Sequence, residues 1–313
     1  MTIEANAKVN FTLEVFGKRA DGYHALRSVV MPISLADTLD VEATDDGLIT
    51  SDTGYDDDLC VKAARVLKCV ATASSPSRGG NDGEDAVVTQ KGATIRVTKR
   101  IPAGGGLGGG SADAAAVLRA LNELWRIGLP CEELAEIGAQ VGSDVPALVL
   151  GGPVIMEGRG EIVKSIGACA CSDLSSEHRN IRPSEHVRTL NLVLVNPGVS
   201  SSTAEVYGAL GERASRPFYG AANATAEMVS ALQAGDLSRI AAAFMNDLQP
   251  PAVKRHPEIA DALVSLKTAG VIGAMMSGSG ASVFGIVRDA AEAERISSEM
   301  NAHGYKAWPV QTL

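Results

Sequence analysis

The sequence predicts an α/β (α+β) protein with two domains, and three observations support this. Its 313 residues are enough for two hydrophobic cores of ordinary size. Residues 93–99 alternate in polarity and are rich in β-branched side chains, as in a strand, whereas the apolar residues of 117–125 recur at helical spacing. Strand and helix patterns alternate again over 190–300, which favours a smaller α/β layer with its helices on one face.

The other elements are predicted from shorter patterns. Residues 5–14 alternate as a strand, so Lys8 and Asn10 are expected to share one of its faces. Asp58 gives an acidic start to a predicted helix over 58–67. A helix is also predicted at 131–138, a strand at 190–195, a glycine turn with an apolar strand at 274–286, and polar surface insertions at 71–90 and 168–189.

The stretch from Pro102 to Ala116 is very dense in glycine and lies directly before the predicted central helix. Ser111 is predicted to be the N-cap of that helix, and Asp113 to lie in its first turn, where a carboxylate favours the positive end of the helix dipole. Glycine lets backbone N–H groups approach phosphate oxygens, and the helix start adds unpaired N–H donors. A flexible loop is the simpler alternative, but the glycine density before a capped helix favours a phosphate-binding loop.

Three familiar phosphate loops fit this stretch less well. The P-loop ends in Gly-Lys-Ser/Thr, but the Gly-Lys pair at residues 17–18 is followed by Arg19. The G-x-G-x-x-G spacing of dinucleotide-binding proteins occurs at Gly104, Gly106 and Gly109, yet about a hundred residues precede it, whereas that unit usually opens its domain. A protein-kinase loop would need a valine two residues after its last glycine and a later Asp-Phe-Gly, and both are missing.

Composition argues against several classes of protein. The net charge of −9, without a basic stripe, argues against a nucleic-acid-binding surface. No apolar run approaches the roughly 18 residues of a membrane span, and the N-terminus does not resemble a signal peptide, so a cytoplasmic protein is expected. The five cysteines are odd in number and unevenly spaced, which predicts free thiols.

The residues 102–112, Pro-Ala-Gly-Gly-Gly-Leu-Gly-Gly-Gly-Ser-Ala, resemble the central motif of the GHMP kinases. The resemblance implies an ATP-dependent kinase that phosphorylates a small-molecule alcohol, with ATP and Mg²⁺ as cofactors and with metal ligands that stay unassigned. It also implies the two-domain GHMP kinase fold, with an ATP-binding domain at 1–155 and a ferredoxin-like substrate domain at 156–313. The last residues are expected to pack back on the first domain, and the assembly to be a monomer or homodimer.

Arg-x-Asp-Gly-Tyr-His at residues 19–24 resembles the members of this family that act on a cytidine diphosphate-linked alcohol. The resemblance implies that Tyr23 stacks on the cytosine ring, that His24 hydrogen-bonds it, and that Thr203 and Tyr207 complete the substrate site. Without it, Tyr23 would be a partly buried loop residue and Tyr207 a core residue of a helix. A mevalonate or homoserine kinase, or a catalytically silent nucleotide-binding relative, stays the alternative.

The catalytic residues are implied by the same resemblance. Gly-Ser-Asp-Val-Pro at 142–146 matches the motif of the family's catalytic aspartate, here Asp144, although Asp144 alone would more simply be an N-cap before Pro146. The two interpretations agree, because a carboxylate at a helix start stays ionised, as a general base requires. Lys8 is implied to assist catalysis and Asn10 to bind substrate, whereas a lone lysine on a strand is usually just solvated.

The resemblance also assigns the ATP site and a supporting loop. Asp58 stands where the family usually has an asparagine near adenine. Residues 274–286 resemble the third motif of the family, which folds against the phosphate loop. The residues implied to bind ATP are Pro102, Ala103, Gly104, Gly105, Gly106, Leu107, Gly108, Gly109, Gly110, Ser111, Ala112, Lys99 and Asp58.

Overall fold

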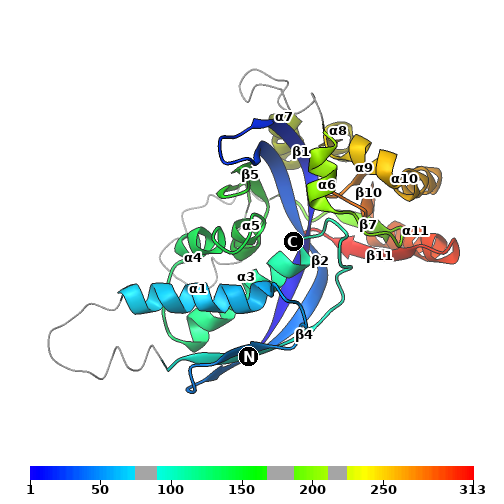
Figure 1. Cartoon of the computed structure of the whole chain (residues 1–313). Coiled ribbons are helices and arrows are strands. Elements are labelled where there is room, and N and C mark those ends of the chain that lie inside the picture. Colours follow the sequence, from blue (N-terminus) through cyan, green and yellow to red (C-terminus); the bar gives the residue numbers. More distant parts are fainter. Residues whose placement is uncertain (75–89, 168–186, 211–223) are drawn as a thin grey trace, which may run out of the picture. The chain divides into compact units, whose positions relative to one another are not determined.

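The computed structural model describes residues 1–74, 90–167, 187–210 and 224–313 (Figure 1). Most of the two predicted polar insertions, namely 75–89 and 168–186, lies outside the described residues. The chain divides into two compact units, each built from three stretches. Unit 1 comprises Met1–Asn6, Ala36–Ile101 and Gly109–Leu150, and unit 2 comprises Ala7–Leu35, Pro102–Gly108 and Gly151–Leu313.

The described residues of unit 1 comprise four helices and some strands of a seven-stranded sheet. Strand β4 (Gly92–Thr98) pairs antiparallel with the second half of β2 (His24–Thr44) and parallel with β3 (Ile49–Ser51). The central helix α3 (Gly109–Leu124) packs against the other three, and its alanines, Val117, Leu118 and Leu121 are buried. The other helices are α1 (Leu59–Ser74), α4 (Cys131–Gly138) and α5 (Val145–Leu150).

These elements confirm the predicted strand before the glycine stretch and the helix after it, but they correct the helix start. Helix α3 begins at Gly109, so Ser111 is not its N-cap, and Asp113 lies beyond its first turn. The physical reason is the backbone: Gly104, Gly106 and Gly108 have positive φ, and the chain becomes helical directly afterwards, so the last two glycines form helix instead of loop.

The other strands of this seven-stranded sheet belong mostly to unit 2 and are arranged around β1 (Thr2–Lys18) and the first half of β2. Strand β1 pairs parallel with β8 (Met245–Asn246), and β2 pairs antiparallel with β5 (Val154–Gly158), which in turn pairs with β6 (Ile162–Ser165). Odd-numbered residues of β1 such as Val9 and Phe11 are buried and apolar, whereas the even-numbered residues from Lys8 to Glu14 are buried and polar. The predicted strand is therefore confirmed, and both of its faces are covered.

The second sheet of unit 2 has four strands in the order β11-β7-β10-β9, and all neighbours are antiparallel. Helix α10 packs against β9 and β10, and α11 against β7 and β11. Helical segments connect β7 to β9, and α11 connects β10 to β11, which is the ferredoxin-like order predicted for this part of the chain. The elements are β7 (Asn191–Asn196), β9 (Gly273–Met276), β10 (Val283–Val287), β11 (Lys306–Gln311), α10 (Glu258–Thr268) and α11 (Ala290–Ala302).

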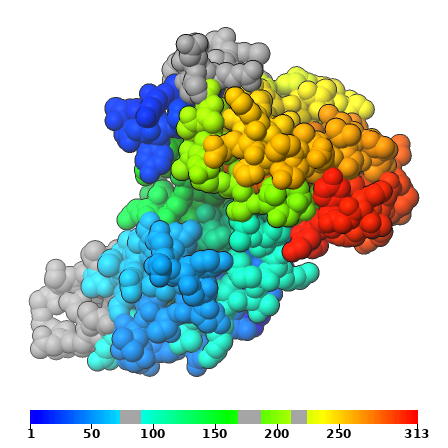
Figure 2. Space-filling view, turned by 45° about the vertical axis from the view of Figure 1, so that its right-hand side comes forward, coloured from blue at the N-terminus to red at the C-terminus, as the bar shows by residue number. Residues whose placement is uncertain are grey.

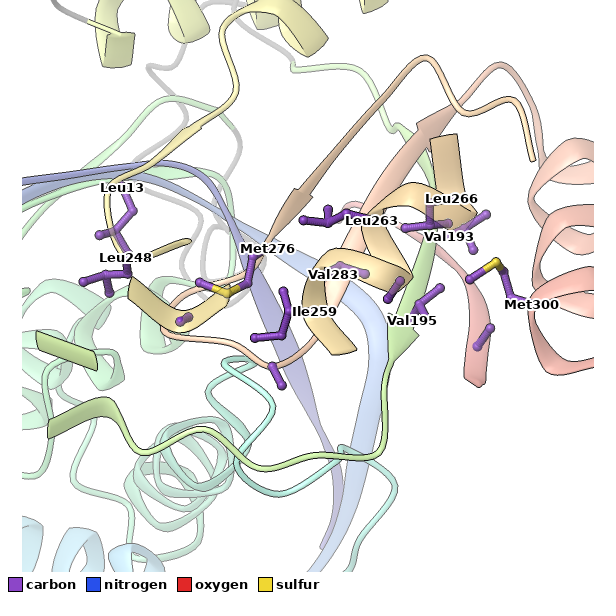
Figure 3. Packing of buried hydrophobic residues seen from close by; sticks show 14 of the residues in the cluster. Leu13, Val193, Val195, Leu248, Ile259, Leu263, Leu266, Met276, Val283 and Met300 are labelled. Atoms are coloured by element: carbon purple, nitrogen blue, oxygen red, sulfur yellow. The ribbon is translucent and has the colours of Figure 1, made fainter. Parts of the chain in front are cut away.

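The main core of unit 2 lies between this sheet and its helices (Figure 3). Val193, Val195 and Val283 of the sheet point toward Ile259 and Leu266 of α10, and all of these side chains are fully buried. Each such side chain contributes about 1.5–3 kcal/mol through burial. The described residues of this unit form four further helices: α6 (Thr203–Gly208), α7 (Ala224–Ala234), α8 (Leu237–Ala242) and α9 (Gln249–Arg255).

The C-terminus of unit 2 is tied to strand β2. Thr312 forms a β-bridge with Ile33, and the N–H of Leu313 donates to the carbonyl of Pro32 at 3.0 Å. In the space-filling view the residues from 224 to 313, coloured yellow to red, form one continuous surface (Figure 2). The packing of the last residues therefore holds part of β2 in place within this unit.

The cysteines partly confirm the predicted free thiols. Cys60 and Cys69 are free, but Cys131 is disulfide-bonded, so the prediction is wrong for that residue. Sequence spacing did not indicate the bond because a disulfide depends on which cysteines the fold brings together. Cys169 and Cys171 lie outside the described residues. In the part of the chain that the structure describes, none of the helices has the length and apolarity needed to cross a membrane.

Candidate active site

The first part of the glycine stretch, Pro102–Gly108, is held in unit 2 by its carbonyl groups. The carbonyl of Gly104 accepts from the N–H of Ser201 at 3.3 Å, and that of Gly105 from the N–H of Ser282 at 3.1 Å. The carbonyl of Gly106 accepts from the Ser277 hydroxyl at 3.0 Å, and that of Leu107 from the N–H of Lys8 at 3.0 Å. Four successive peptide groups thus have their oxygens fixed.

This fixing determines where the N–H groups of the loop point. In a trans peptide the N–H points opposite to the C=O, so the N–H groups of residues 105–108 face away from the partners just described. Within the described chain none of these four N–H groups donates to a protein acceptor. They form a row of unused donors directly before helix α3, as an anion site requires.

The loop has no room for side chains at its glycines. A Cβ at Gly104 would lie 2.1 Å from the Ser200 hydroxyl, and one at Gly106 would lie 2.2 Å from the Ser277 carbonyl. Both glycines also have positive φ, which other residues rarely adopt. The glycines at these two positions are therefore explained by close packing and by their backbone conformation.

The segment Ser277–Ser282, between β9 and β10, packs against this loop and is held from the other side by Asn246. The Asn246 amide donates to the carbonyls of Met276 and Gly278, both at 2.8 Å. Asn196 donates to the Ser282 hydroxyl at 3.2 Å. The structure thus brings the third-motif segment onto the glycine loop, as the resemblance implies.

Lys8 and Asn10 lie at the same place. The Lys8 ammonium donates to the Asn10 side-chain carbonyl at 2.6 Å, and the Lys8 residue is only 4% exposed. A Cβ added to Gly278 would lie 3.3 Å from the Lys8 Nζ and 3.4 Å from the Asn10 Oδ1. Lys8, Asn10, the glycine loop and the third-motif segment therefore form one cluster in unit 2.

The predicted base-binding residues lie near the start of β2 and in α6. The rings of His24 and Tyr207 stack with 5.6 Å between centroids and 27° between planes. The Tyr23 ring is exposed, and the Arg159 guanidinium lies 5.6 Å from its centroid. The Thr203 hydroxyl is 2.8 Å from that of Ser279, which connects α6 to the third-motif segment.

Burial lowers the pKa of His24 from its ordinary value of 6.5, and the nearby charge of Lys18 lowers it further. A lowered pKa keeps the imidazole neutral near neutral pH, with one ring nitrogen as donor and the other as acceptor. A neutral ring of this kind can hydrogen-bond the edge of a base that presents both donors and acceptors.

In unit 1, Lys99 lies beside the start of α3. Its ammonium donates to Asp37 at 2.5 Å and to Asp113 at 2.7 Å. A Cβ added to Gly109 would lie 3.5 Å from the Lys99 Nζ, which places this cation at the first residue of the helix. Asp37 is fully buried and also accepts from the backbone N–H groups of Arg100 and Ile101.

Burial and ion pairing have opposite effects on the pKa values of Lys99 and Asp113. Burial disfavours the charged form of Lys99, but its hydrogen bonds to Asp113 and Asp37 outweigh this and raise its pKa. Burial raises the pKa of Asp113 to about 6, although Lys99 acts in the opposite direction. The other carboxylate oxygen of Asp113, Oδ1, is buried and makes no hydrogen bond with the described residues. One cation shared by two carboxylates thus stands at the helix start.

Asp58 precedes α1 and accepts from the N–H of Cys60 at 2.8 Å and from the Thr53 hydroxyl at 2.7 Å. Burial acts to raise the pKa of Asp58, but these hydrogen bonds outweigh it and lower the pKa. A Cβ at Gly110 would lie 3.5 Å from Leu59, so the start of α1 adjoins the start of α3. The structure therefore places Asp58 next to the helix that follows the glycine loop.

Asp144 is half-buried and directly precedes α5. A Cβ added to Gly142 would lie 3.7 Å from the Ser111 hydroxyl, so the turn before Asp144 lies against the first residues of α3. Unit 1 thus carries Asp144, Ser111, Lys99 and Asp58 around the start of this helix. In the described ranges, with their three gaps, no three His, Cys, Asp or Glu side chains are grouped to hold a metal.

Sequence reasoning missed the residues that hold the loops. Asn196, Ser201 and Ser282 fix the glycine loop or its neighbour, and Asn246 holds the third-motif segment. Asp37 and Asp113 were not predicted as partners of Lys99. A signal was present in the small polar residues beside glycine at 200–202 and 277–282, but their partners lie far away in the sequence.

Comparison with known proteins decides the family. The model of the GHMP kinases N terminal domain matches residues 61–152, and that of the GHMP kinases C terminal matches residues 228–306. A relative from Pelotomaculum thermopropionicum is 38% identical over 95% of this chain and 93% of its own length. The chain belongs to the GHMP kinases. It is therefore a member of a family of small-molecule kinases, as the glycine stretch predicted.

The most informative relatives carry one name. The protein from Pelotomaculum thermopropionicum and one from Symbiobacterium thermophilum, which is 35% identical over the whole of both chains, are each a 4-diphosphocytidyl-2-C-methyl-D-erythritol kinase. A crystal structure of a 4-(cytidine 5'-diphospho)-2C-methyl-D-erythritol kinase is 30% identical, with a TM-score of 0.75 over 100% of this chain and 99% of that chain. A mevalonate kinase from L. major shares the fold at 18% identity and a TM-score of 0.69 over 100% of this chain and 95% of that one.

Proposed function

We propose that this GHMP kinase transfers the γ-phosphoryl group of ATP to the C2 hydroxyl of 4-diphosphocytidyl-2-C-methyl-D-erythritol, a step toward isoprenoid precursors. The names of its full-length relatives support this substrate. The observation that carries it is the stacked pair of His24 and Tyr207, with Tyr23 next in the chain. Mevalonate and homoserine have no base for such rings to hold.

The glycine loop would bind the phosphates of ATP. Its free N–H groups at residues 105–108 can donate to phosphate oxygens, and the start of α3 adds further donors. Lys99 supplies a cation at Gly109, and Asp58 lies beside the same helix start. Phosphoryl transfer depends mainly on positioning and on electrostatic stabilisation, and these groups provide both.

Asp144 is proposed to accept the proton of the C2 hydroxyl as it attacks the γ-phosphoryl group. Lys8, oriented by Asn10, is proposed to stabilise the negative charge that develops on the transferred oxygens. Asn10, Thr203, Tyr207, Tyr23 and His24 are proposed to bind the substrate. These roles follow the motif positions, and the hydrogen bonds and ring contacts described above support them.

Mg²⁺ is a proposed cofactor, and the donors of unit 1 suit it. The Ser111 hydroxyl lies against Gly142, two residues before Asp144, and hydroxyl and carboxylate oxygens are both possible ligands of Mg²⁺. Mg²⁺ prefers oxygen ligands and keeps several waters and substrate phosphates, so few protein oxygens are needed. When bound, it would neutralise phosphate charge.

Three further proposals follow the family resemblance. The protein is proposed to act in the cytoplasm on a small-molecule substrate, as a monomer or homodimer. The division into an ATP-binding domain at 1–155 and a substrate domain at 156–313 is kept as a proposal. Limited proteolysis with and without ATP would show whether the two parts behave as separate domains.

The direct test measures ADP release by the purified protein with three alcohols: the cytidylated methylerythritol, mevalonate and homoserine. Turnover is expected with the cytidylated alcohol alone. The Asp144→Asn variant is expected to lose about 10²- to 10⁴-fold in kcat, because it lacks the general base. Turnover with mevalonate or homoserine would contradict the proposed substrate, and ATP binding without any turnover would favour a catalytically silent protein.

A further inference from the structure

Strand β1 carries an unusual buried polar face in unit 2. Lys8, Asn10, Thr12 and Glu14 occupy alternate positions, and each is at least 96% buried. Burying a polar group costs free energy unless it is hydrogen-bonded. The hydrogen bonds of these four residues therefore indicate why polar side chains stand at positions where apolar ones would be more stable.

At the Lys8 end of this polar face, hydrogen bonds orient the Lys8 ammonium. The Asn10 side-chain carbonyl accepts from the Lys8 ammonium at 2.6 Å, while its amide donates to the Ser28 hydroxyl at 2.8 Å. The single proton of Ser28 is donated to the carbonyl of Thr12 at 2.5 Å, so this hydroxyl can only accept from Asn10. This fixes the orientation of the Asn10 amide, and the oxygen must face Lys8.

At the other end of the polar face, Thr12 and Glu14 contact Thr225 of helix α7. The Thr225 hydroxyl donates to the Glu14 carboxylate at 2.8 Å and lies 3.1 Å from the Thr12 hydroxyl. Because Thr225 has one proton and gives it to Glu14, the Thr12 hydroxyl must donate to Thr225. The Thr12 oxygen also accepts from the N–H of Val29 at 2.9 Å.

Thr12 connects the two groups of hydrogen bonds, because it takes part in both. Thr12 receives the Ser28 proton at its carbonyl and the Val29 N–H at its hydroxyl, so it holds two successive residues of β2. The position of Ser28 then sets that of Asn10, and Asn10 sets that of Lys8. A continuous chain of directed hydrogen bonds thus leads from α7 to the Lys8 ammonium.

We infer that Thr225 and Glu14 are positioning residues for Lys8, holding it through Thr12, Ser28 and Asn10 in the place that phosphoryl transfer requires. This inference rests on the proposed role of Lys8. Thr225 stands more than two hundred residues from Lys8 in the sequence, and among the described residues these hydrogen bonds connect it to β1. Loss of its hydroxyl removes the hydrogen bond to the Glu14 carboxylate and the acceptor of the Thr12 proton, while the Thr12 hydroxyl still accepts from the N–H of Val29.

The test compares three variants. Thr225→Val removes the hydroxyl while keeping a side chain of similar volume. Thr225→Ser and Glu14→Gln both still allow the hydrogen bond between residues 225 and 14. We expect Thr225→Val to lower kcat roughly tenfold, as a small misplacement of a charged group does, while the KM for ATP changes less than about twofold. Thr225→Ser is expected to restore most of kcat, and Glu14→Gln to lose less than Thr225→Val because its amide oxygen still accepts.

Thr312→Val is the matched control, because it also removes a buried threonine hydroxyl, one that accepts from the N–H of Leu190 directly before β7. Both valine variants are expected to lower Tm, but only Thr225→Val lowers kcat. An unchanged kcat in Thr225→Val, or an equal loss in Thr312→Val, would overturn the inference.

A second readout separates this inference from the proposed reaction. Exchange of the Asn10 side-chain amide protons, followed by NMR, is expected to be faster in Thr225→Val than in Thr312→Val. If the wild-type protein phosphorylates none of the alcohols, the proposed function fails, and the exchange rate alone decides the inference. Equal exchange in both variants would contradict it.

Discussion

Two lysines lie beside the glycine stretch, and the structure holds them in different ways. Lys99 of unit 1 is one-third exposed and donates to two carboxylates, Asp37 and Asp113. Lys8 of unit 2 is almost fully buried and donates to the neutral carbonyl of Asn10. The first cation is held by ion pairs with two carboxylates, and the second is oriented by a short hydrogen bond to a side-chain amide.

The difference matches what each lysine is proposed to do. A cation that binds nucleotide phosphates works through its charge, and two carboxylates keep that charge permanent by raising the pKa of Lys99. A cation that stabilises a transition state must be placed accurately, because the developing charge occupies one position. Replacing Lys8 is therefore expected to lower mainly kcat, and replacing Lys99 to weaken mainly ATP binding.

Lys8→Met should have the largest effect. We expect kcat to fall roughly 10²- to 10³-fold, because the group that stabilises the transferred oxygens is lost, while ATP binding changes little. The measurement is steady-state kinetics with the cytidylated alcohol, together with the Kd for ATP from calorimetry. Lys68→Met is the matched control, since the Lys68 ammonium donates to the carbonyl of Gly47, far from the loop in sequence. Equal losses in both variants would contradict the special role of Lys8.

Lys99→Met should raise the KM for ATP about tenfold, with a smaller change in kcat. It should also lower the free energy of unfolding by about 1–3 kcal/mol near neutral pH, because two buried carboxylates lose their shared partner. The loss should depend on pH. The folded pKa of Asp113 is already about 6, above its unfolded value of 3.8, so its contribution to stability is present at low pH and is lost as pH rises through about 6.

Urea unfolding of Lys99→Met between about pH 5 and pH 8 checks this, and the variant should become relatively more stable as the pH falls. The control is Lys99→Met combined with Asp113→Asn, in which this pH dependence should largely disappear. A loss of stability in Lys99→Met that is the same at every pH would show that charge does not hold this lysine.

Lys18→Met should have the smallest effect of the three lysine variants. It tests a third lysine, whose charge acts on the pKa of His24. The charge of Lys18 adds to burial in lowering the pKa of His24, so its removal should raise that pKa slightly while burial still keeps it below 6.5. The neutral imidazole contributes stability above pH 6.5 that is lost as the pH falls through its lowered pKa. NMR titration of the His24 ring protons measures the change, and an unchanged or lower pKa would be the contrary outcome.

The sequence predicted features that depend on neighbouring residues. The strand before the glycine stretch, the helix after it, and the shared face of Lys8 and Asn10 all follow from local periodicity, and the structure confirms them. The ferredoxin-like sheet followed from the family resemblance and is also confirmed. The predicted start of α3 was wrong by three residues, because glycine is compatible with both loop and helix.

Features that depend on distant residues were not predictable. The carbonyls of Gly105 and Gly106 are held by Ser282 and Ser277, more than 170 positions along the chain in each case. The partners of Lys99 likewise come from β2 and α3. A serine or aspartate has no periodic pattern that names its partner, so such contacts become visible only in the fold.

The proposed functional residues remain open to experiment, and one measurement tests the central claim most directly. The product formed from ATP and the cytidylated methylerythritol is examined by phosphorus NMR. The account predicts one new phosphomonoester on the tertiary C2 alcohol, with the diphosphate linkage to cytidine intact. A phosphate on another hydroxyl, or cleavage of the diphosphate, would contradict it.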